Sequence, residues 1–221
     1  MPPAHTTRLG TRRQPEESRA SILKAAIREF AREGVAGART DAIARFAGVN
    51  KALLYYYFRD KEALYDAVLE EVFSGVRRVI HQVLSHKLPP RERLAAYVGA
   101  HFDYIASNPQ YHRLVHAELL RASRDPSRLR RVARQYFRPV FRELSTLLEE
   151  GAETGDFERV DPVQFIPSMV SVIVFYFTTA PIMEVIAGFD PMASERLTER
   201  RAAVIDFISA ALFTPTGGVR P

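Results

Sequence analysis

A capping side chain placed directly before a proline is the feature of this sequence that most restricts its fold. The pattern occurs four times, at Asn108-Pro109, Asp125-Pro126, Asp161-Pro162 and Asp190-Pro191. Asn and Asp accept hydrogen bonds from the free N–H groups at a helix start, and proline fits the first helical position. The chain has no Asn-Gly or Asp-Gly hairpin turn and no sustained alternation of apolar and polar residues. We therefore expect an all-α fold.

Apolar periodicity, with glycine and proline boundaries, predicts about nine helices. The first runs from about residue 15 to 33 and ends at Gly34. Two short helices follow, and a long helix over about 61–86 joins them to the rest of the chain. Further helices are expected over 90–107, after each of the first three capping pairs, and over 194–213.

Charge is unevenly distributed along the chain. Residues 1–61 contain 12 Lys+Arg against 6 Asp+Glu, whereas the remainder contains 19 against 20. This asymmetry favours nucleic acid or an anionic surface as the partner of the N-terminal end. The absence of cysteine excludes disulfides, thiolate metal sites and a Cys nucleophile. The polar, basic start resembles neither a secretory signal nor a membrane anchor, so we expect a cytoplasmic protein.

An uncharged stretch extends from Pro162 to Met183, which makes a membrane span an alternative to a buried helix. Two prolines and several polar residues interrupt it, and no basic flank anchors it. We therefore expect no membrane, and a helix covered on every side. The last helix offers it an apolar stripe of Leu197, Val204, Ile205, Ile208, Ala211 and Leu212. Two such helices from each of two chains would form a four-helix dimer interface.

Residues 40–64, TDAIARFAGVNKALLYYYFRDKEAL, contain the signals of two short helices joined by a tight turn. Thr40 is predicted to cap the first helix, and Gly48 to end it by adopting a left-handed conformation. Val49 is an apolar plug, and Asn50 is predicted to cap the second helix. Two short helices meeting at a steep angle form a helix-turn-helix, whose second helix enters the major groove of double-stranded DNA.

In the second short helix, Leu54 and Phe58 are spaced to face the core. The residues turned partly or wholly outward are then Lys51, Ala52, Leu53, Tyr55, Tyr56 and Tyr57. Three adjacent tyrosines cannot share one buried stripe of a helix. Their hydroxyls can bond phosphate oxygens and their rings can contact thymine methyl groups. The alternative, packing under the following helix, is expected for part of Tyr57.

This segment resembles the DNA-binding region of the TetR (tetracycline-repressor) family of bacterial transcriptional regulators. The resemblance spans residues 15–75, and its matching positions are Thr40, Ile43-Ala44, Ala47-Gly48-Val49, Leu54 to Phe58, Lys61 and Leu64. It implies that Lys61 contacts phosphate and that Tyr55 and Tyr56 contact DNA. Residues 50–53, Asn-Lys-Ala-Leu, depart from the small polar residues common in the family. Lys51 can reach a guanine edge or only a phosphate, and both alternatives stay open.

The predicted DNA-binding residues are Arg39, Thr40, Asn50, Lys51, Ala52, Leu53, Tyr55, Tyr56, Tyr57 and Lys61. Arg39 and Thr40 are included because helix N-termini attract phosphate, although an ordinary surface charge is nearly as good an interpretation of Arg39. Arg12 and Arg13 are interpreted as part of a solvated tail rather than as minor-groove contacts.

The resemblance also implies a domain organisation. It consists of a disordered basic arm (1–14), a helix-turn-helix DNA-binding domain (15–60), a connecting helix (61–86), a C-terminal ligand-binding and dimerisation domain (87–215) and a tail (216–221). We expect a homodimeric repressor released from a palindromic operator by a small, apolar effector that is still unidentified, with no cofactor, metal or catalytic site. An activator or a corepressor-dependent form is equally compatible. The alternative from another class is an all-α small-molecule-binding enzyme or carrier.

The effector pocket cannot be assigned from the sequence. Its lining is expected to be apolar with a few polar groups such as His101, His116 or Thr178. The aromatic residues between 102 and 177 are expected to belong mostly to the core. His112 and His116 lie four apart on one helix, a spacing that can share a metal, but no carboxylate pattern accompanies them. We interpret them as surface or pocket histidines.

Overall fold

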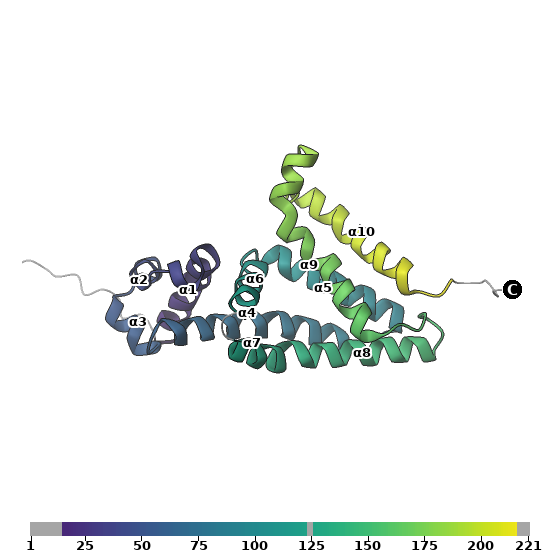
Figure 1. Cartoon of the computed structure of the whole chain (residues 1–221), viewed down its shortest axis with the longest axis horizontal. Helices are drawn as coiled ribbons and strands as arrows, with labels where there is room; N and C mark the ends of the chain where they lie inside the picture. The colour runs from purple at the N-terminus through teal and green to yellow at the C-terminus, as the bar shows by residue number, and fades with distance from the viewer. Residues whose placement is uncertain (1–14, 123–125, 216–221) are drawn as a thin grey trace, which may run out of the picture. The chain divides into compact units, whose positions relative to one another are not determined.

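The computed structural model describes residues 15–122 and 126–215, and these ranges are built from helices (Figure 1). The helices are α1 (Pro15–Gly37), α2 (Thr40–Ala47), α3 (Lys51–Tyr57), α4 (Lys61–Leu84), α5 (Pro90–Ser107), α6 (Tyr111–Ala122), α7 (Pro126–Val132), α8 (Arg138–Glu153), α9 (Pro162–Ala187) and α10 (Ser194–Leu212). The described residues contain no strand beyond one isolated antiparallel bridge between Phe157 and Phe213. The all-α prediction is confirmed. The basic arm, Asp125 and the C-terminal tail lie outside the described residues.

A π-helical turn, η1 (Ala133–Phe137), joins α7 to α8 without a break. Because these three elements form one continuous rod, the described ranges contain nine helical rods, in agreement with the expected number. A π-helical turn is wider than an α-helical one by a residue, and such turns are often found at functional sites.

The chain separates into two compact units, and the boundary lies within α4 between Val68 and Leu69. The first unit contains α1 to α3 and the start of α4. Its helix α1 is interrupted at Gly34, where φ is 64°, so the predicted stop at this glycine is confirmed. The buried residues of this unit include Ile22, Leu23, Ala26, Phe30, Ile43, Leu54, Phe58, Leu64 and Tyr65.

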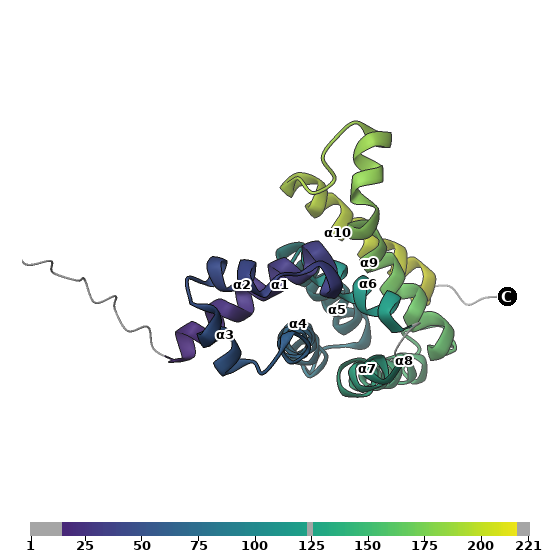
Figure 2. The ribbon, with the colours of Figure 1, turned by 60° about the vertical axis from the view of Figure 1, so that its left-hand side comes forward.

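In the second unit, α5 packs against α8, α9 and α10. Phe102 of α5 and Phe177 of α9 meet with ring centres 4.9 Å apart. Arg91, at the start of α5, donates to Asp156 Oδ1 (3.1 Å) and to the carbonyl oxygen of Thr214 (2.7 Å), which holds the chain beyond α10 against this unit. The turn between α9 and α10 extends away from the other helices of the unit (Figures 1 and 2).

Helix α9 is buried on one face only, so the expectation of a helix covered on every side is wrong for the single chain. Ile166, Ile173 and Phe177 are buried, but Phe175 is 64% exposed and Val185 84% exposed. The cause is that α9 projects past its neighbours, and all residues from 181 to 190 are exposed. By length and apolar composition, α9 is the one helix of the described residues that meets the requirements of a membrane span.

The apolar stripe of α10 was expected to cover α9. Val204, Ile208 and Leu212 of that stripe are buried, but α10 packs mainly against α5 and only to a small extent against α9. The exposed side of α10 carries Phe207, which is 62% exposed. The sequence pattern thus identified an amphipathic helix but not its main partner.

Candidate nucleic-acid interface

The connection between α2 and α3 has the predicted turn geometry. Gly48 adopts a left-handed conformation, with φ 68° and ψ 35°, and its N–H donates to the carbonyls of Ala44 and Arg45. The Val49 N–H donates to the Ala44 carbonyl at 3.0 Å. Asn50 caps α3, since its Oδ1 accepts the Leu53 N–H at 2.7 Å. These local bonds fix the direction in which α3 leaves the turn.

The start of α2 differs from the prediction that Thr40 is its cap. Arg39 occupies the cap position, and Thr40 is the first helical residue. The Arg39 N–H donates to the carboxylate of Glu29, a buried residue of α1, at 3.2 Å. The Thr40 hydroxyl instead lies 3.2 Å from the hydroxyl of Tyr55. The Arg39 side chain makes no cap hydrogen bond, and Glu29, ten positions earlier in the chain, instead binds the backbone N–H of the cap residue itself.

Helix α3 divides cleanly into a buried and an exposed side. Leu54 and Phe58 are 0% and 4% exposed, as predicted for core residues. Tyr56 is 80% exposed and Tyr55 40% exposed. Tyr57 is half-buried, with its ring edge-on to that of Tyr56 at a centroid distance of 5.3 Å. The prediction that the three tyrosines do not share a buried stripe is confirmed.

Lys51, the first residue of α3, is held by an ion pair with Asp41 of α2. The Lys51 Nζ lies 2.8 Å from Asp41 Oδ1, and both side chains are exposed. The hydrogen bond and the charge of Lys51 lower the pKa of Asp41, and Asp41 raises the pKa of Lys51 by the same two effects. An exposed pair of this kind is screened by salt, so Lys51 can exchange Asp41 for another anion at little cost.

Lys61 lies at the first position of α4. Its Nζ donates to the carbonyl oxygen of Ala36, near the end of α1, at 3.1 Å. The preceding residue Asp60 accepts the Ala63 N–H at 2.7 Å and so caps α4. The Lys61 amine is therefore held at the carboxyl end of α1, while its backbone belongs to the first turn of α4, whose free N–H groups attract anions.

The predicted site residues fall into three groups. Contacts between α2 and α3 place the hydroxyl of Thr40 beside that of Tyr55, and the amine of Lys51 beside the carboxylate of Asp41. Asn50, Ala52 and Leu53 form the first turn of α3, where Ala52 is exposed and Leu53 half-buried. Lys61 has a separate contact with the end of α1. Sequence reasoning did not identify Glu29 or Asp41 as residues that position this surface, because each acts through a partner on another helix.

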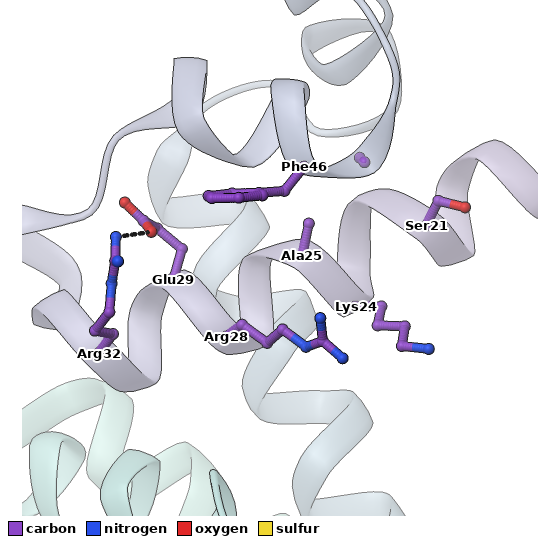
Figure 3. Close-up of a pocket in the computed structure, with 8 residues that line it drawn as sticks. Ser21, Lys24, Ala25, Arg28, Glu29, Arg32 and Phe46 are labelled. Carbon is purple, nitrogen blue, oxygen red and sulfur yellow. Dashed lines mark hydrogen bonds and ion pairs between the residues drawn. The ribbon is translucent and has the colours of Figure 1, made fainter.

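A groove of about 460 Å³ runs between α1 and α2 on the same unit (Figure 3). It is lined by Ser21, Lys24, Ala25, Arg28, Glu29, Arg32, Phe46 and Ala47. Phe46, which is 66% exposed, projects from α2 between Glu29 and Ala25, and the charged ends of Lys24 and Arg28 point away from its ring (Figure 3). Arg32 pairs with Glu29 at 2.9 Å. The groove adds basic side chains to the positively charged end of the molecule.

Comparison with protein families matches both units. Residues 22–68 match the family described as bacterial regulatory proteins, tetR family. Residues 90–208 match the family described as tetracyclin repressor-like, C-terminal domain. The chain belongs to the TetR family. The regulator is therefore a DNA-binding transcription factor, and the resemblance inferred from residues 15–75 is confirmed.

Curated relatives of this TetR-family regulator are transcription factors. The transcriptional repressor NicS of Pseudomonas putida is 32% identical over 107 residues, which are 48% of this chain and 50% of that protein. The transcriptional activator FasR of Mycolicibacterium smegmatis is 38% identical over 113 residues, 51% of this chain and 52% of that protein. The chain thus spans about half the length of these two relatives. The regulator RutR of Escherichia coli is 28% identical over 76% of this chain and 77% of its own.

Solved structures support the same fold. The transcriptional regulator SCO4942 of Streptomyces coelicolor has a TM-score of 0.68 and 28% identity, over 90% of this chain and 99% of that chain. The ketosteroid transcriptional regulator KstR2 of Mycobacterium tuberculosis has a TM-score of 0.73 over 89% of this chain and 95% of its own. At 18% identity, the second likeness concerns the fold alone.

Proposed function

We propose that this TetR-family regulator is a homodimeric repressor that binds a palindromic operator and is released from it by a small, apolar effector. The observation that carries the proposal is the exposed side of α3, where Tyr56 is 80% exposed while Leu54 and Phe58 are buried. A helix that keeps large aromatic side chains in water on one side, at the basic end of the molecule, fits a recognition helix.

The proposed contacts differ in what they contribute. The first residues of α3, Asn50 to Leu53, would approach base edges, with Lys51 reaching either a guanine or a phosphate. The hydroxyls of Tyr55 and Tyr56, with a smaller contribution from the half-buried Tyr57, would bond phosphate oxygens. Lys61 and the start of α2 at Arg39 and Thr40 would bind the DNA backbone. Phosphate contacts set the register, and the base contacts of α3 provide the specificity.

Dimerisation through α9 and α10 is supported by the apolar side chains that the single chain leaves exposed. Phe175, Ile182, Val185, Ile186 and Phe207 are between 59% and 84% exposed. A soluble protein seldom exposes so many large apolar side chains on adjoining elements unless a partner covers them. A second copy would cover them symmetrically and would provide two heads for two half-sites.

The dimer proposal has a direct test. Phe175→Glu should convert the protein to a monomer in analytical ultracentrifugation, because a charge would be buried in an apolar interface. It should also abolish tight binding to a two-half-site duplex. A dimer that persists in this variant, or a protein that needs detergent to stay soluble, would contradict the proposed interface.

We propose that residues 15–60 form the DNA-binding domain. A helix over residues 61–86 would connect it to a second domain, residues 87–215, which would bind the effector and form the dimer. The protein would act in the cytoplasm, away from membranes and without catalysing a reaction. Release requires that the effector bind the DNA-incompetent conformation more tightly than the competent one, since equal affinity would shift no population. NicS is a repressor and FasR an activator, so a reporter assay must determine the sign of regulation.

Selection of bound sequences from a random duplex pool, followed by salt titration of the selected site, tests DNA recognition. We expect a near-palindrome whose affinity falls steeply with salt, because Lys and Arg contacts release counterions from the phosphates. Absence of any enriched sequence, together with turnover of a small molecule, would favour an enzyme or carrier instead.

A further inference from the structure

The second unit contains a cavity of about 200 Å³ whose walls come from α4, α5, α6, η1, α8 and α9. Its lining is almost entirely aromatic and aliphatic and includes three tyrosines, Tyr97, Tyr111 and Tyr136. Of the three polar residues that the sequence suggested for a pocket, His101 lines this cavity, whereas His116 and Thr178 do not. The cavity suits the small, apolar effector of the proposed function. A feature outside that site lies in the first unit, at the start of α2.

Helix α2 begins without the side-chain bonds that usually fix a helix start. Its cap residue, Arg39, makes no side-chain cap hydrogen bond. A capping box would also place Glu or Gln at the third helical position, where the side chain accepts the N–H of the cap residue. That position is occupied by Ala42, which has no acceptor in its side chain. The side chains of α2 therefore cannot hold the residue at its own start.

Glu29 of α1 provides the missing acceptor. Its Oε1 accepts the Arg39 N–H at 3.2 Å, which is the backbone group that a capping box would bind. Glu29 is 4% exposed, and α1 packs against α2. A buried hydrogen bond is stronger than an exposed one, because little water competes for its donor and acceptor. Glu29 therefore fixes the position of the backbone from which α2 starts.

The charge of Glu29 is offset by Arg32. Arg32 Nη2 donates to Glu29 Oε2 at 2.9 Å (Figure 3). The Nε of the same guanidinium lies 2.9 Å from Oε1 of the exposed Glu33. An unpaired carboxylate beside the start of α2 would repel a phosphate that approaches the free N–H groups of the helix. With Arg32 in place, Glu29 acts on α2 mainly as a hydrogen-bond acceptor.

The start of α2 carries several of the groups proposed to bind the DNA backbone. They are the side chains of Arg39 and Thr40 and the first N–H groups of the helix. The Thr40 hydroxyl also lies 3.2 Å from the hydroxyl of Tyr55 on α3. Lys61 donates to a carbonyl at the end of α1 and so holds the other side of the same connection. A displacement of Arg39 would move these groups together, and Glu29 can thus act on DNA without touching it.

We propose that Glu29 is a positioning residue for operator binding. Its carboxylate accepts the Arg39 N–H and holds the start of α2 in the orientation in which it binds phosphate. This inference rests on the DNA contacts of α2 in the proposed function. The bond between Glu29 and Arg39 can be measured without DNA.

Two substitutions of similar size separate the acceptor from the charge. Glu29→Gln keeps an acceptor oxygen and loses the charge, whereas Glu29→Met loses both. If charge alone mattered, both variants would bind an anionic duplex at least as tightly as the wild-type protein. We expect this of Glu29→Gln only, and we expect Glu29→Met to bind the selected operator about tenfold more weakly than Glu29→Gln. Fluorescence anisotropy with the full-length proteins measures both affinities.

The salt dependence of binding is a readout that a loss of stability would not change. The slope of log affinity against log salt should be smaller for Glu29→Met by about one for each DNA-binding head, because Arg39 no longer neutralises a phosphate. Glu33→Met is the matched control, since Glu33 pairs with the same Arg32 on the surface. This control should keep the wild-type slope and bind the operator at least as tightly as the wild-type protein.

Hydrogen exchange of the Arg39 amide, followed by ¹⁵N NMR without DNA, tests the bond directly. We expect wild-type protection in Glu29→Gln and about tenfold faster exchange in Glu29→Met. If Glu29→Met does not fold, Glu29→Asp replaces it, because it keeps the charge but withdraws the carboxylate by one bond. Glu29→Asp should show the same faster exchange and weaker operator binding.

Equal operator affinity of Glu29→Gln and Glu29→Met would overturn the proposal. So would an unchanged salt slope in Glu29→Met, or an equal loss of affinity in Glu33→Met. Failure of the proposed function looks different: the wild-type protein would select no palindromic duplex, but the Arg39 amide would still be protected in Glu29→Gln and exchange faster in Glu29→Met.

Discussion

The tyrosines of α3 and the tyrosines around the C-terminal cavity have opposite environments. Tyr56 is 80% exposed, and its hydroxyl has no part in the core. Tyr97 and Tyr111 are 0% and 5% exposed, and burial raises the pKa of both well above that of a free phenol. On α3 the phenol is available to a large anionic partner, whereas around the cavity it must form its contacts inside the protein.

In the first unit the residues proposed to bind DNA are not core residues, whereas in the second unit the residues that line the cavity are also core residues. The exposed side chains of α3 can be changed without removing core contacts, since Leu54 and Phe58 hold the helix from its other side. Tyr97, Tyr111 and Tyr136, by contrast, both pack the core of their unit and line its cavity. Stability and binding should therefore be separable in the first unit and coupled in the second.

The largest expected effect is on the stability of the first unit. Phe58→Ala should lower its free energy of unfolding by about 3–5 kcal/mol, because it removes a buried aromatic ring. Tyr56→Ala, two residues earlier, should change it by less than about 0.5 kcal/mol, as is usual at an exposed position. Chemical denaturation, followed by hydrogen exchange at the backbone amides of α1 to α3, measures the stability of the two variants. Similar losses of stability in Phe58→Ala and Tyr56→Ala would show that the two sides of α3 contribute equally to the fold.

A second prediction concerns the pH dependence of stability in the cavity unit. Unfolded His101 gains a proton near pH 6.5, whereas in the folded protein burial lowers its pKa to about 4. The unfolded state therefore binds more protons between these values, and stability decreases as the pH falls from 6.5 to 4. The decrease attributable to His101 is about 3 kcal/mol. His101→Phe should show a correspondingly flatter curve in denaturation at several pH values, and an unchanged slope would mean that His101 is accessible to protons.

DNA affinity provides the third test. Tyr56→Ala and Lys61→Ala should each weaken operator binding by about 1–3 kcal/mol if their contacts are direct, and should leave the fold intact. Phe46→Ala is the matched control, since Phe46 is 66% exposed on the same unit but does not belong to the proposed site. Fluorescence anisotropy with the selected operator measures all three. If both site variants bind like wild type, the DNA-binding face lies elsewhere.

The smallest expected effect involves the pair of Asp41 and Lys51. Asp41→Asn removes a carboxylate that competes with phosphate for the Lys51 amine, at 2.8 Å in the free protein. Operator affinity at low salt should rise by about threefold, and the gain should diminish as salt screens the charges. A loss of affinity would show that Asp41 positions Lys51 for a base contact instead. Asp60→Asn, a carboxylate that caps α4, serves as the comparison.

Short-range signals made the first unit predictable. The left-handed Gly48 and the Asn50 cap act within three or four residues, and the spacing of Leu54 and Phe58 defines the buried side of α3. The cap assigned to Thr40 was wrong by one residue: Arg39 occupies that position without a side-chain cap bond, and its own N–H donates to the buried carboxylate of Glu29 on α1. Local capping preferences do not include such a partner.

The second unit was less predictable because its features depend on which helices meet. An apolar stripe shows that a face is buried but does not show which element covers it, and α10 proved to pack mainly against α5 rather than against α9. The exposed side of α9 follows from its projection past its neighbours, which no local pattern encodes. The sequence suggested His101 as a polar pocket residue, but its unpaired Nε2 follows from burial and from the position of Tyr97.

The π-helical turn at residues 133–137 has a consequence for how the packing of α7 beside the cavity can diverge among relatives. A wide turn of this kind is equivalent to one residue inserted into an α-helix. Deleting one exposed residue there, Arg134 or Gln135, should restore a regular helix and rotate the preceding turn by about 100° relative to α8. The residues of α7 would then turn away from their present partners on α6, whereas Tyr136 and Phe137 would keep their spacing to Leu144. A single-residue deletion, rather than a series of substitutions, is thus the shortest evolutionary route to a repacked α7 beside an unchanged set of cavity residues.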